Sequence, residues 1–121
     1  MDLELSETVR DGYAVVALHG ELDISNASDL RERLLAILRD QARSLVLDLS
    51  RLTFIDSTGL SVLVATERQA NQLGGTLSLA GPQKIAARVL HVSGLDRHFP
   101  IFPTVDEAIP GGENDPPLAA T

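Results

Sequence analysis

The feature that most constrains the fold is an alternation of short apolar segments with amphipathic helical patterns, which begins after a hairpin signal. The segments Leu3–Val9 and Tyr13–Leu18 flank Asp11-Gly12, a dipeptide typical of the turn between antiparallel strands. Further strand-like segments follow at Leu45–Leu49 and Thr76–Ala80, and helical patterns separate them. Because parallel strands need such crossover connections, the sequence predicts a single α/β domain with a mixed sheet.

Three segments have the apolar spacing of helices that bury one face. Ser25 and Asn26 are candidate N-caps of the first helix, and Gly74-Gly75 is expected to end the second. The third helix is expected to begin at Gly81-Pro82, with the proline in its first turn, and to end at Gly94. The inward positions are predicted to be Leu30, Leu34, Ile37 and Leu38 in the first helix, Leu60, Leu63, Val64, Ala70 and Leu73 in the second, and Ile85, Val89 and Val92 in the third.

Two short segments, Ile101-Phe102 and Val105–Ile109, complete the body of the chain. The remainder from Pro110 to Thr121 concentrates proline and glycine, carries two acids and no base, and has no apolar period. We therefore expect a folded domain over residues 1–109 and a disordered acidic tail over residues 110–121. Whether Leu45–Leu49 is buried on one face or on both stays open at this point.

The charge balance limits the classes of partner. Seventeen acidic and ten basic residues give a net charge of −7, which repels nucleic acid and anionic membranes. The amino terminus lacks the basic and apolar regions of a secretory signal, and no apolar run is long enough to span a bilayer. The chain has no cysteine, which fits a reducing compartment. A cytoplasmic protein is therefore expected.

Residue patterns typical of catalysis are missing from the sequence. It contains no glycine-rich phosphate-binding loop, and His19, His91 and His98 lie in three different predicted elements without metal-ligand spacing. Ser57 lacks the flanking glycine of a hydrolase elbow, and nothing brings Asp48 close to Asp56. We therefore expect no enzyme activity, no cofactor and no metal site.

The turn Asp56-Ser57-Thr58-Gly59, just before the second helix, allows two interpretations. In the first, a hydroxyl caps the free amides of the helix and Asp56 complements its positive end. In the second, Ser57 accepts a phosphate, because free amides and the helix dipole favour an anion there. The phosphate would add about −1.5 to −2 charges to a surface that already contains Asp56, without unfolding the turn, and like charges forced together across an interface would weaken the binding of a docked partner.

Three neighbours of Ser57 bear on the second interpretation. Gly59, lacking a side chain, could let a partner approach the Ser57 hydroxyl closely, or could serve turn geometry alone. Thr58 is the nearest alternative acceptor, although a plain role in the first helical turn is favoured. Ser61 lies one turn further along the helix.

The order of these motifs resembles the STAS domain family, specifically its bacterial anti-sigma factor antagonists. The resemblance extends from Leu3 to about Ile109 and rests on Leu45-Val-Leu-Asp-Leu-Ser, Phe54-Ile-Asp-Ser-Thr-Gly-Leu60, Gly20-Glu-Leu-Asp23, Gly74-Gly75 and Ser93-Gly-Leu95. Ser61 departs from it, because that position is commonly glycine in these antagonists. The resemblance implies a STAS-like mixed sheet with helices packed mainly on one face.

The same resemblance implies a function and a set of site residues. The expected protein binds an anti-sigma factor with serine kinase activity and so frees a sigma factor. Phosphorylation of Ser57 by that partner, with ATP, ends the binding, and a serine phosphatase restores it. The residues expected to contact the partner are Glu21, Leu22, Asp23, Asp56, Ser57, Thr58 and Gly59.

Two alternatives stay open. The first is a constitutive STAS scaffold, or an accessory subunit of a larger complex, in which the same turn docks a partner and is never modified. The second is a sensor of a nucleotide or another small molecule that holds an anion at the helix start.

Overall fold

The computed structural model describes residues 2–110, so most of the predicted tail at 110–121 lies outside the described residues. These residues form five strands, four α-helices and one short 3-10 helix. In chain order the elements are β1 (Leu3–Arg10), β2 (Tyr13–Leu22), α1 (Ala27–Asp40), β3 (Ser44–Ile55), α2 (Ser57–Gln72), β4 (Leu77–Ala80), α3 (Lys84–Val92), η1 (Leu95–Arg97), β5 (Ile101–Phe102) and α4 (Val105–Ala108).

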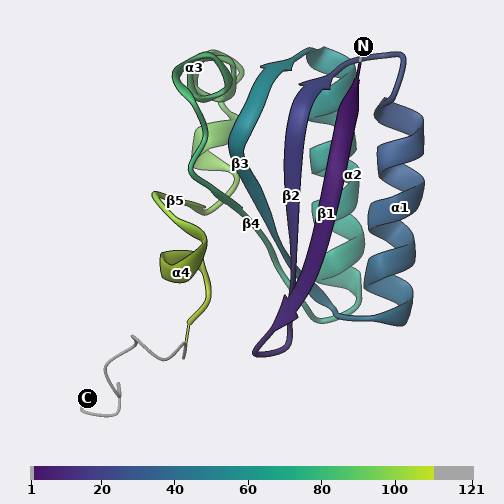
Figure 1. The fold of residues 1–121 in the computed structure, drawn as a ribbon. Coiled ribbons are helices and arrows are strands. Elements are labelled where there is room, and N and C mark those ends of the chain that lie inside the picture. Colours follow the sequence, from purple (N-terminus) through teal and green to yellow (C-terminus); the bar gives the residue numbers. More distant parts are fainter. Residues whose placement is uncertain (1, 111–121) are drawn as a thin grey trace.

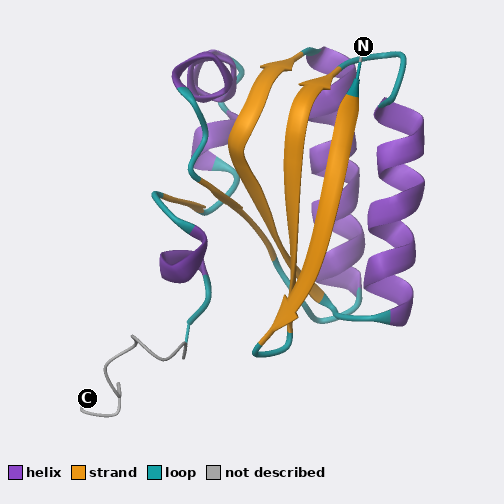
Figure 2. Ribbon diagram, viewed as in Figure 1, coloured by secondary structure: helices purple, strands orange, loops and turns teal. Residues whose placement is uncertain are grey.

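The five strands form one mixed sheet in the order β1-β2-β3-β4-β5. The β1–β2 pair is antiparallel, and the other three pairs are parallel. Asp11, with a φ of 48°, and Gly12, with a φ of 84°, make the turn of the hairpin. Figure 1 shows α1 and α2 side by side behind the sheet, and Figure 2 shows the same layers by element type. The predicted α/β class and mixed sheet are confirmed.

The main core lies between the sheet and helices α1, α2 and α3. Alternate residues of β2 and β3 point into it, including Val16, Leu18, Leu45 and Leu47, all fully buried. A smaller apolar cluster on the opposite face of the sheet joins Val15, Val46 and Ala80 to Ala108 and Ile109 near α4. The sequence left the burial of the Leu45–Leu49 segment open, and the structure shows burial on both faces at Leu45–Leu47, where Val46 packs against Ala108 and Ile109, whereas Ser50, Arg51, Thr53 and Phe54 further along β3 are exposed.

Strand β3 is longer than the predicted Leu45–Leu49 segment and runs on to Ile55. Its second half pairs with the end of β2, where Glu21 lies opposite Phe54 and Leu22 opposite Ile55. Two irregularities in the register accompany this pairing. The extension matters because it carries the chain to the same end of the sheet at which β2 finishes.

The predicted inward face of the third helix is wrong in part. Helix α3 begins at Lys84, so Pro82 precedes it, and its buried residues are Ala86 and Leu90. Val89 is partly buried against the core, whereas Ile85 is 60% and Val92 77% exposed. The small Ala86 side chain lets the helix backbone approach the core, and that contact turns Ile85 and Val92 towards solvent. No helix within residues 2–110 has the length and apolar character required to span a membrane.

Candidate functional site

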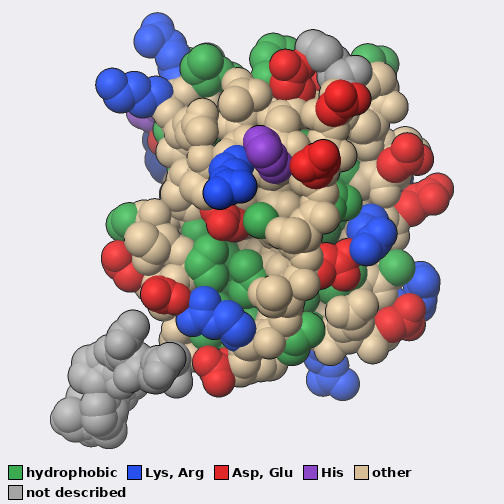
Figure 3. Space-filling model, in the orientation of Figure 1, with side chains coloured by type: hydrophobic (Ala, Val, Ile, Leu, Met, Phe, Trp, Pro, Cys, Tyr) green, Lys and Arg blue, Asp and Glu red, His purple; other side chains and the backbone are tan. Residues whose placement is uncertain are grey.

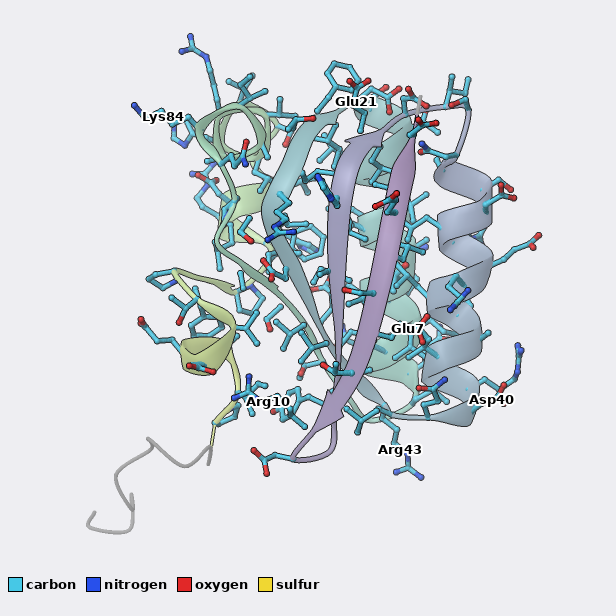
Figure 4. All side chains as sticks on the ribbon, in the orientation of Figure 1. Glu7, Arg10, Glu21, Asp40, Arg43 and Lys84 are labelled. Atoms are coloured by element: carbon cyan, nitrogen blue, oxygen red, sulfur yellow. The ribbon has the colours of Figure 1, made fainter. Side chains whose placement is uncertain are left out.

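The candidate site lies where β2 and β3 end, at the start of α2. The backbone N–H of Asp56 donates to the carbonyl of Leu22 over 3.3 Å, which extends the pairing of the two strands. The structure therefore places the Glu21–Asp23 segment beside the turn of residues 56–59. Glu21 is labelled at the upper end of the sheet in Figure 4, and the start of α2 lies at the same end in Figure 1.

Asp56 connects the two segments through both of its carboxylate oxygens. As the N-cap of α2, it accepts a hydrogen bond from the N–H of Gly59 at Oδ1 over 2.9 Å. Its Oδ2 accepts from the N–H of Ile24, in the loop after β2, over 3.2 Å. The expectation that a hydroxyl caps this helix is wrong, because the carboxylate reaches the third-residue amide and Ser57 is already helical. The internal bonds of Asp56 favour a positioning role over direct partner contact.

Ser57 is the first residue of α2 and is exposed. Its carbonyl accepts a hydrogen bond from the hydroxyl of Ser61 over 3.0 Å, so the Ser61 hydroxyl is engaged within the helix. Thr58 is half-buried. Of these three hydroxyl side chains, that of Ser57 is therefore the one that is exposed and, among residues 2–110, makes no hydrogen bond to the helix start.

Gly59 and Leu22 support the site from beneath. Both are buried, and a Cβ built on Gly59 would lie 2.8 Å from Cγ of Leu22 and 2.9 Å from Cγ1 of Ile55. The absence of a side chain at Gly59 thus allows α2 to pack closely on the ends of β2 and β3. From the sequence alone, only partner approach or turn geometry was expected for this glycine. The Leu22 side chain is fully buried and packs beneath Gly59, so it supports the turn from within.

The loop after β2 is held by side-chain to backbone hydrogen bonds. The Asn26 side chain donates to the carbonyl of Glu21 over 2.9 Å and accepts from the N–H of Asp23 over 3.0 Å. Asn26 is the N-cap residue of α1, as predicted, although its side chain makes no cap bond. Asparagine side chains commonly stabilise turns in this way. The preference of asparagine for turns is therefore the sequence signal for the loop-stabilising role of Asn26, whereas the prediction treated Asn26 only as a helix cap.

Asp23 and Glu21 make the site acidic. The Asp23 carboxylate accepts from the hydroxyl and the N–H of Ser25, over 2.5 and 2.9 Å. Chiefly the hydroxyl bond lowers the pKa of Asp23 below its ordinary value. Glu21 is half-buried, and its Oε1 is buried without a hydrogen-bond partner among the described residues. With Asp56, three carboxyl groups therefore belong to the segments around Ser57.

A groove beside Ser57 was not predicted from the sequence. It has a volume of about 460 Å³ and lies between α1 and α2, with Thr58, Ser61 and Val62 on one side and Ala27 and Arg31 on the other. Ile24 lines it and is 76% exposed. An exposed isoleucine next to an acidic turn is a candidate anchor for a protein partner. The sequence signal that could have identified Ile24 as exposed is its position between Asp23 and Ser25, outside the periodic pattern of the helix.

Within residues 2–110, histidines and acids do not gather into a group that could hold a metal ion. His98 pairs with Glu67 at 2.5 Å and His91 with Asp96 at 2.7 Å, whereas His19 lies 3.9 Å from Glu4. Asp48 accepts from the N–H of Ser50 in its own strand. The chemistry available near Ser57 is therefore that of a hydroxyl acceptor among carboxylates.

Replacing Asp56 is expected to loosen the site measurably. Asp56→Ala removes the helix cap, which typically costs about 1 kcal/mol of unfolding free energy, and also frees the Ile24 amide. Asp56→Asn keeps one side-chain oxygen, which can still accept from the N–H of Gly59. The other position becomes an NH₂ group, which cannot accept from the N–H of Ile24. Urea unfolding together with amide hydrogen exchange should show loss of protection at both amides in the alanine variant, and mainly at Ile24 in the asparagine variant. Unchanged exchange at Ile24 in both variants would contradict the bridging role.

The lowered pKa of Asp23 gives a second test. Because the lowered pKa favours the folded state, its stabilising contribution is present at neutral pH and lost as pH falls through that pKa. Ser25→Ala is expected to move the Asp23 pKa back towards its ordinary value, as followed by carboxyl chemical shifts in an NMR titration. Ser28→Ala, which changes an exposed serine of α1, is the matched control. An Asp23 pKa identical in both variants would show that Ser25 is not the cause.

Comparison with known proteins places this site in a family context. The profile of the STAS domain matches residues 4–108. The anti-sigma-F factor antagonist RsfB of Mycobacterium tuberculosis H37Rv is 33% identical over 109 residues, covering 88% of each chain. A crystal structure of an anti-sigma factor antagonist from Mycobacterium paratuberculosis superimposes with a TM-score of 0.80 at 33% identity, covering 88% of this chain and 91% of that one. SpoIIAA of Bacillus in its phosphorylated form has a TM-score of 0.68 at 26% identity, with 88% and 96% covered.

Proposed function

Because the chain belongs to the STAS domain family, we propose that it is an anti-sigma factor antagonist whose unphosphorylated form binds an anti-sigma factor with serine kinase activity. Binding of the antagonist frees a sigma factor for transcription. Phosphorylation of Ser57 by the bound kinase ends the interaction, and a serine phosphatase reverses it. In this proposal the chain is a binding protein with no catalysis of its own, acting in the cytoplasm.

The observation that carries the proposal is the exposed Ser57 hydroxyl at the first position of α2, with the cap supplied by Asp56. The Ser57 oxygen attacks the γ-phosphorus of ATP held by the partner, ADP leaves, and the hydroxyl proton is released. The phosphate then lies at a helix start, whose first N–H groups have no partners within the helix. The fold can therefore accept the modification without unfolding α2.

The electrostatic consequence follows from the carboxylates of the site. A phosphoryl group brings about −1.5 to −2 charges to a turn next to Asp56 and near Asp23. Both acids are held by hydrogen bonds to the loop and the helix start, so they cannot move away cheaply. A partner surface adapted to the unmodified turn is then faced with uncompensated negative charge.

The test is to recover the protein from its own host in growing and in stressed cells and to measure intact mass, followed by peptide mapping. We expect one phosphate on Ser57 whose occupancy changes with condition, and co-purification of an anti-sigma factor with the unmodified form. Thr58→Ala, which leaves Ser57 intact, is expected to be modified like the unaltered chain. Absence of phosphate under every condition, with a partner still bound, would instead support a constitutive scaffold.

A further inference from the structure

Helix α3 carries an exposed surface that the proposed switch does not use. Its inner face is occupied by Ala86 and Leu90. Two rows of side chains run along the rest of the helix, each spaced at i, i+4 and i+7, which places the members of a row on one helix face. The apolar row consists of Ile85, Val89 and Val92. The second row consists of Lys84, Arg88 and His91 and is called the cationic row after the charges of its lysine and arginine.

The apolar row is poorly protected from water. Ile85 is 60% exposed and Val92 77% exposed, and both are among the few large apolar side chains left exposed in the described residues. Val89 lies between them and is partly buried against the core, which anchors the row to the body of the protein. Two large exposed apolar side chains about two turns apart on a rigid helix are typical of a surface that meets another protein.

The cationic row, together with Arg97 of η1, reverses the charge of the protein locally. Lys84, Arg88 and Arg97 lie in the segment from α3 to η1, where Asp96 supplies the one carboxylate, in a chain of net charge −7. None of these three cations is within an ion pair among residues 2–110, and Asp96 is engaged by His91. Figure 3 shows cationic side chains projecting at the upper left, the corner where Lys84 is labelled in Figure 4.

Helix α3 is held firmly in this position. The side chain of Gln83, its N-cap residue, donates to the carbonyl of Ser50 in β3 over 2.7 Å. At its other end, Gly94 has a φ of 81° and turns the chain into η1, and His98 pairs with Glu67 of α2. A preorganised helix loses little conformational freedom when a partner covers it.

We infer that the Lys84–Val92 helix is a second docking surface for the same anti-sigma factor, which meets it with an apolar recess bordered by carboxylates. The inference rests on the proposed function. Figure 1 shows α3 beside the end of β3 at which α2 begins, so the helix and the Ser57 turn lie at one end of the molecule. A standard interface buries about 800 Å² on each partner, which on a domain with a radius of gyration of about 13 Å can include both.

The two surfaces have opposite charge, and this gives the docking a direction. The Ser57 turn is acidic through Glu21, Asp23 and Asp56, whereas α3 presents Lys84 and Arg88. Acidic groups on a partner are attracted to α3 and disfavoured at the Ser57 turn, so the charges of the two surfaces favour one orientation of docking over the reverse one. An anionic membrane would have to approach a protein whose remaining surface is acidic, which disfavours it as the occupant.

The apolar row is tested by combining Ile85→Ser with Val92→Ser and measuring the dissociation constant for the host's anti-sigma factor by titration calorimetry. We expect binding to weaken at least about tenfold, since truncating apolar anchors near the centre of an interface commonly has an effect of this size or larger. Val9→Ser is the matched control, because Val9 is 56% exposed on β1 and lies next to the hairpin turn. It is expected to bind like the unaltered chain.

The cationic row is tested with Lys84→Glu combined with Arg88→Glu. We expect a loss of at least about tenfold, carried mainly by slower association and accompanied by a weaker dependence on salt. Arg43→Glu is the control, and Figure 4 places Arg43 at the lower end of the molecule, away from Lys84. All variants change exposed residues, so their melting temperatures should match that of the unaltered chain.

The outcomes separate the two proposals. If the unaltered chain does not bind the anti-sigma factor, the proposed function fails, and this inference fails with it. If the unaltered chain binds and both α3 variants bind like their controls, only the inference is overturned. It is also overturned if the α3 variants abolish self-association in sedimentation equilibrium, or binding to phosphatidylglycerol vesicles, while leaving anti-sigma factor binding intact.

Discussion

Phosphorylation of Ser57 is expected to weaken the complex with the anti-sigma factor about a hundredfold or more, equivalent to about 2.8 kcal/mol. The expectation follows from placing a dianionic group beside Asp56, whose carboxylate is fixed by the amides of Gly59 and Ile24. Like charges brought together at an interface cost several kcal/mol when water is excluded. The measurement is the dissociation constant of homogeneous unmodified and phosphorylated protein, with circular dichroism to verify that both are folded.

Three variants define what Ser57 contributes. Ser57→Ala is expected to bind the anti-sigma factor and to keep binding in the presence of its kinase activity and ATP. Ser57→Asp should weaken binding less than the phosphate does, because one carboxylate carries less charge and fewer acceptor oxygens. Thr58→Ala, the matched control, should still be switched off by ATP. Loss of binding by Ser57→Ala on addition of ATP would contradict the assignment of Ser57 as the phosphate acceptor.

Replacing Gly59 by alanine is expected to destabilise the domain by about 1–2 kcal/mol. The new methyl group would lie 2.8 Å from Cγ of Leu22 and 2.9 Å from Cγ1 of Ile55, so buried side chains or the start of α2 must shift. Such overpacking costs about 1–3 kcal/mol, and the better helix propensity of alanine offsets part of it. For a domain of this size, each kcal/mol lowers the melting temperature by about 4–8 °C.

The control for Gly59→Ala is Ser61→Ala, two positions along the same helix. Ser61 is exposed, and within residues 2–110 its hydroxyl bonds only to the carbonyl of Ser57, so its loss should change the melting temperature little. Amide exchange at Ile24 and Gly59 reports whether displacement of the helix start also breaks the hydrogen bonds that Asp56 accepts from these two amides. A Gly59→Ala protein as stable as the unaltered chain would show that close packing does not explain this glycine.

Much of the fold could be predicted because the signals are local. An alternating apolar segment and a continuous apolar run flank Asp11-Gly12, and the hairpin turns there with both residues at positive φ. The spacing of Leu30, Leu34 and Ile37 identified the buried face of α1, since helical periodicity alone determines which side chains share a side. Gly74 likewise adopts the left-handed conformation expected after α2.

The third helix shows where local signals fail. Ile85, Val89 and Val92 share one helix face through their i, i+4 and i+7 spacing, so periodicity favoured them as the inner face. The structure instead buries Ala86 and Leu90. Side-chain size predicts burial only where space exists, and close approach of α3 to the sheet favours the small alanine over its larger neighbours.

The candidate site divides in the same way. The sequence by itself determined that an acidic turn with an acceptor hydroxyl precedes an apolar helix, because turn and helix signals act over a few residues. Only the tertiary structure decided that Asp56 caps α2 while holding Ile24, that Gly59 packs on Leu22, and that the groove beside Ile24 opens next to Ser57. These contacts join segments about thirty residues apart and depend on the register of the parallel strands β2 and β3, which no local pattern encodes.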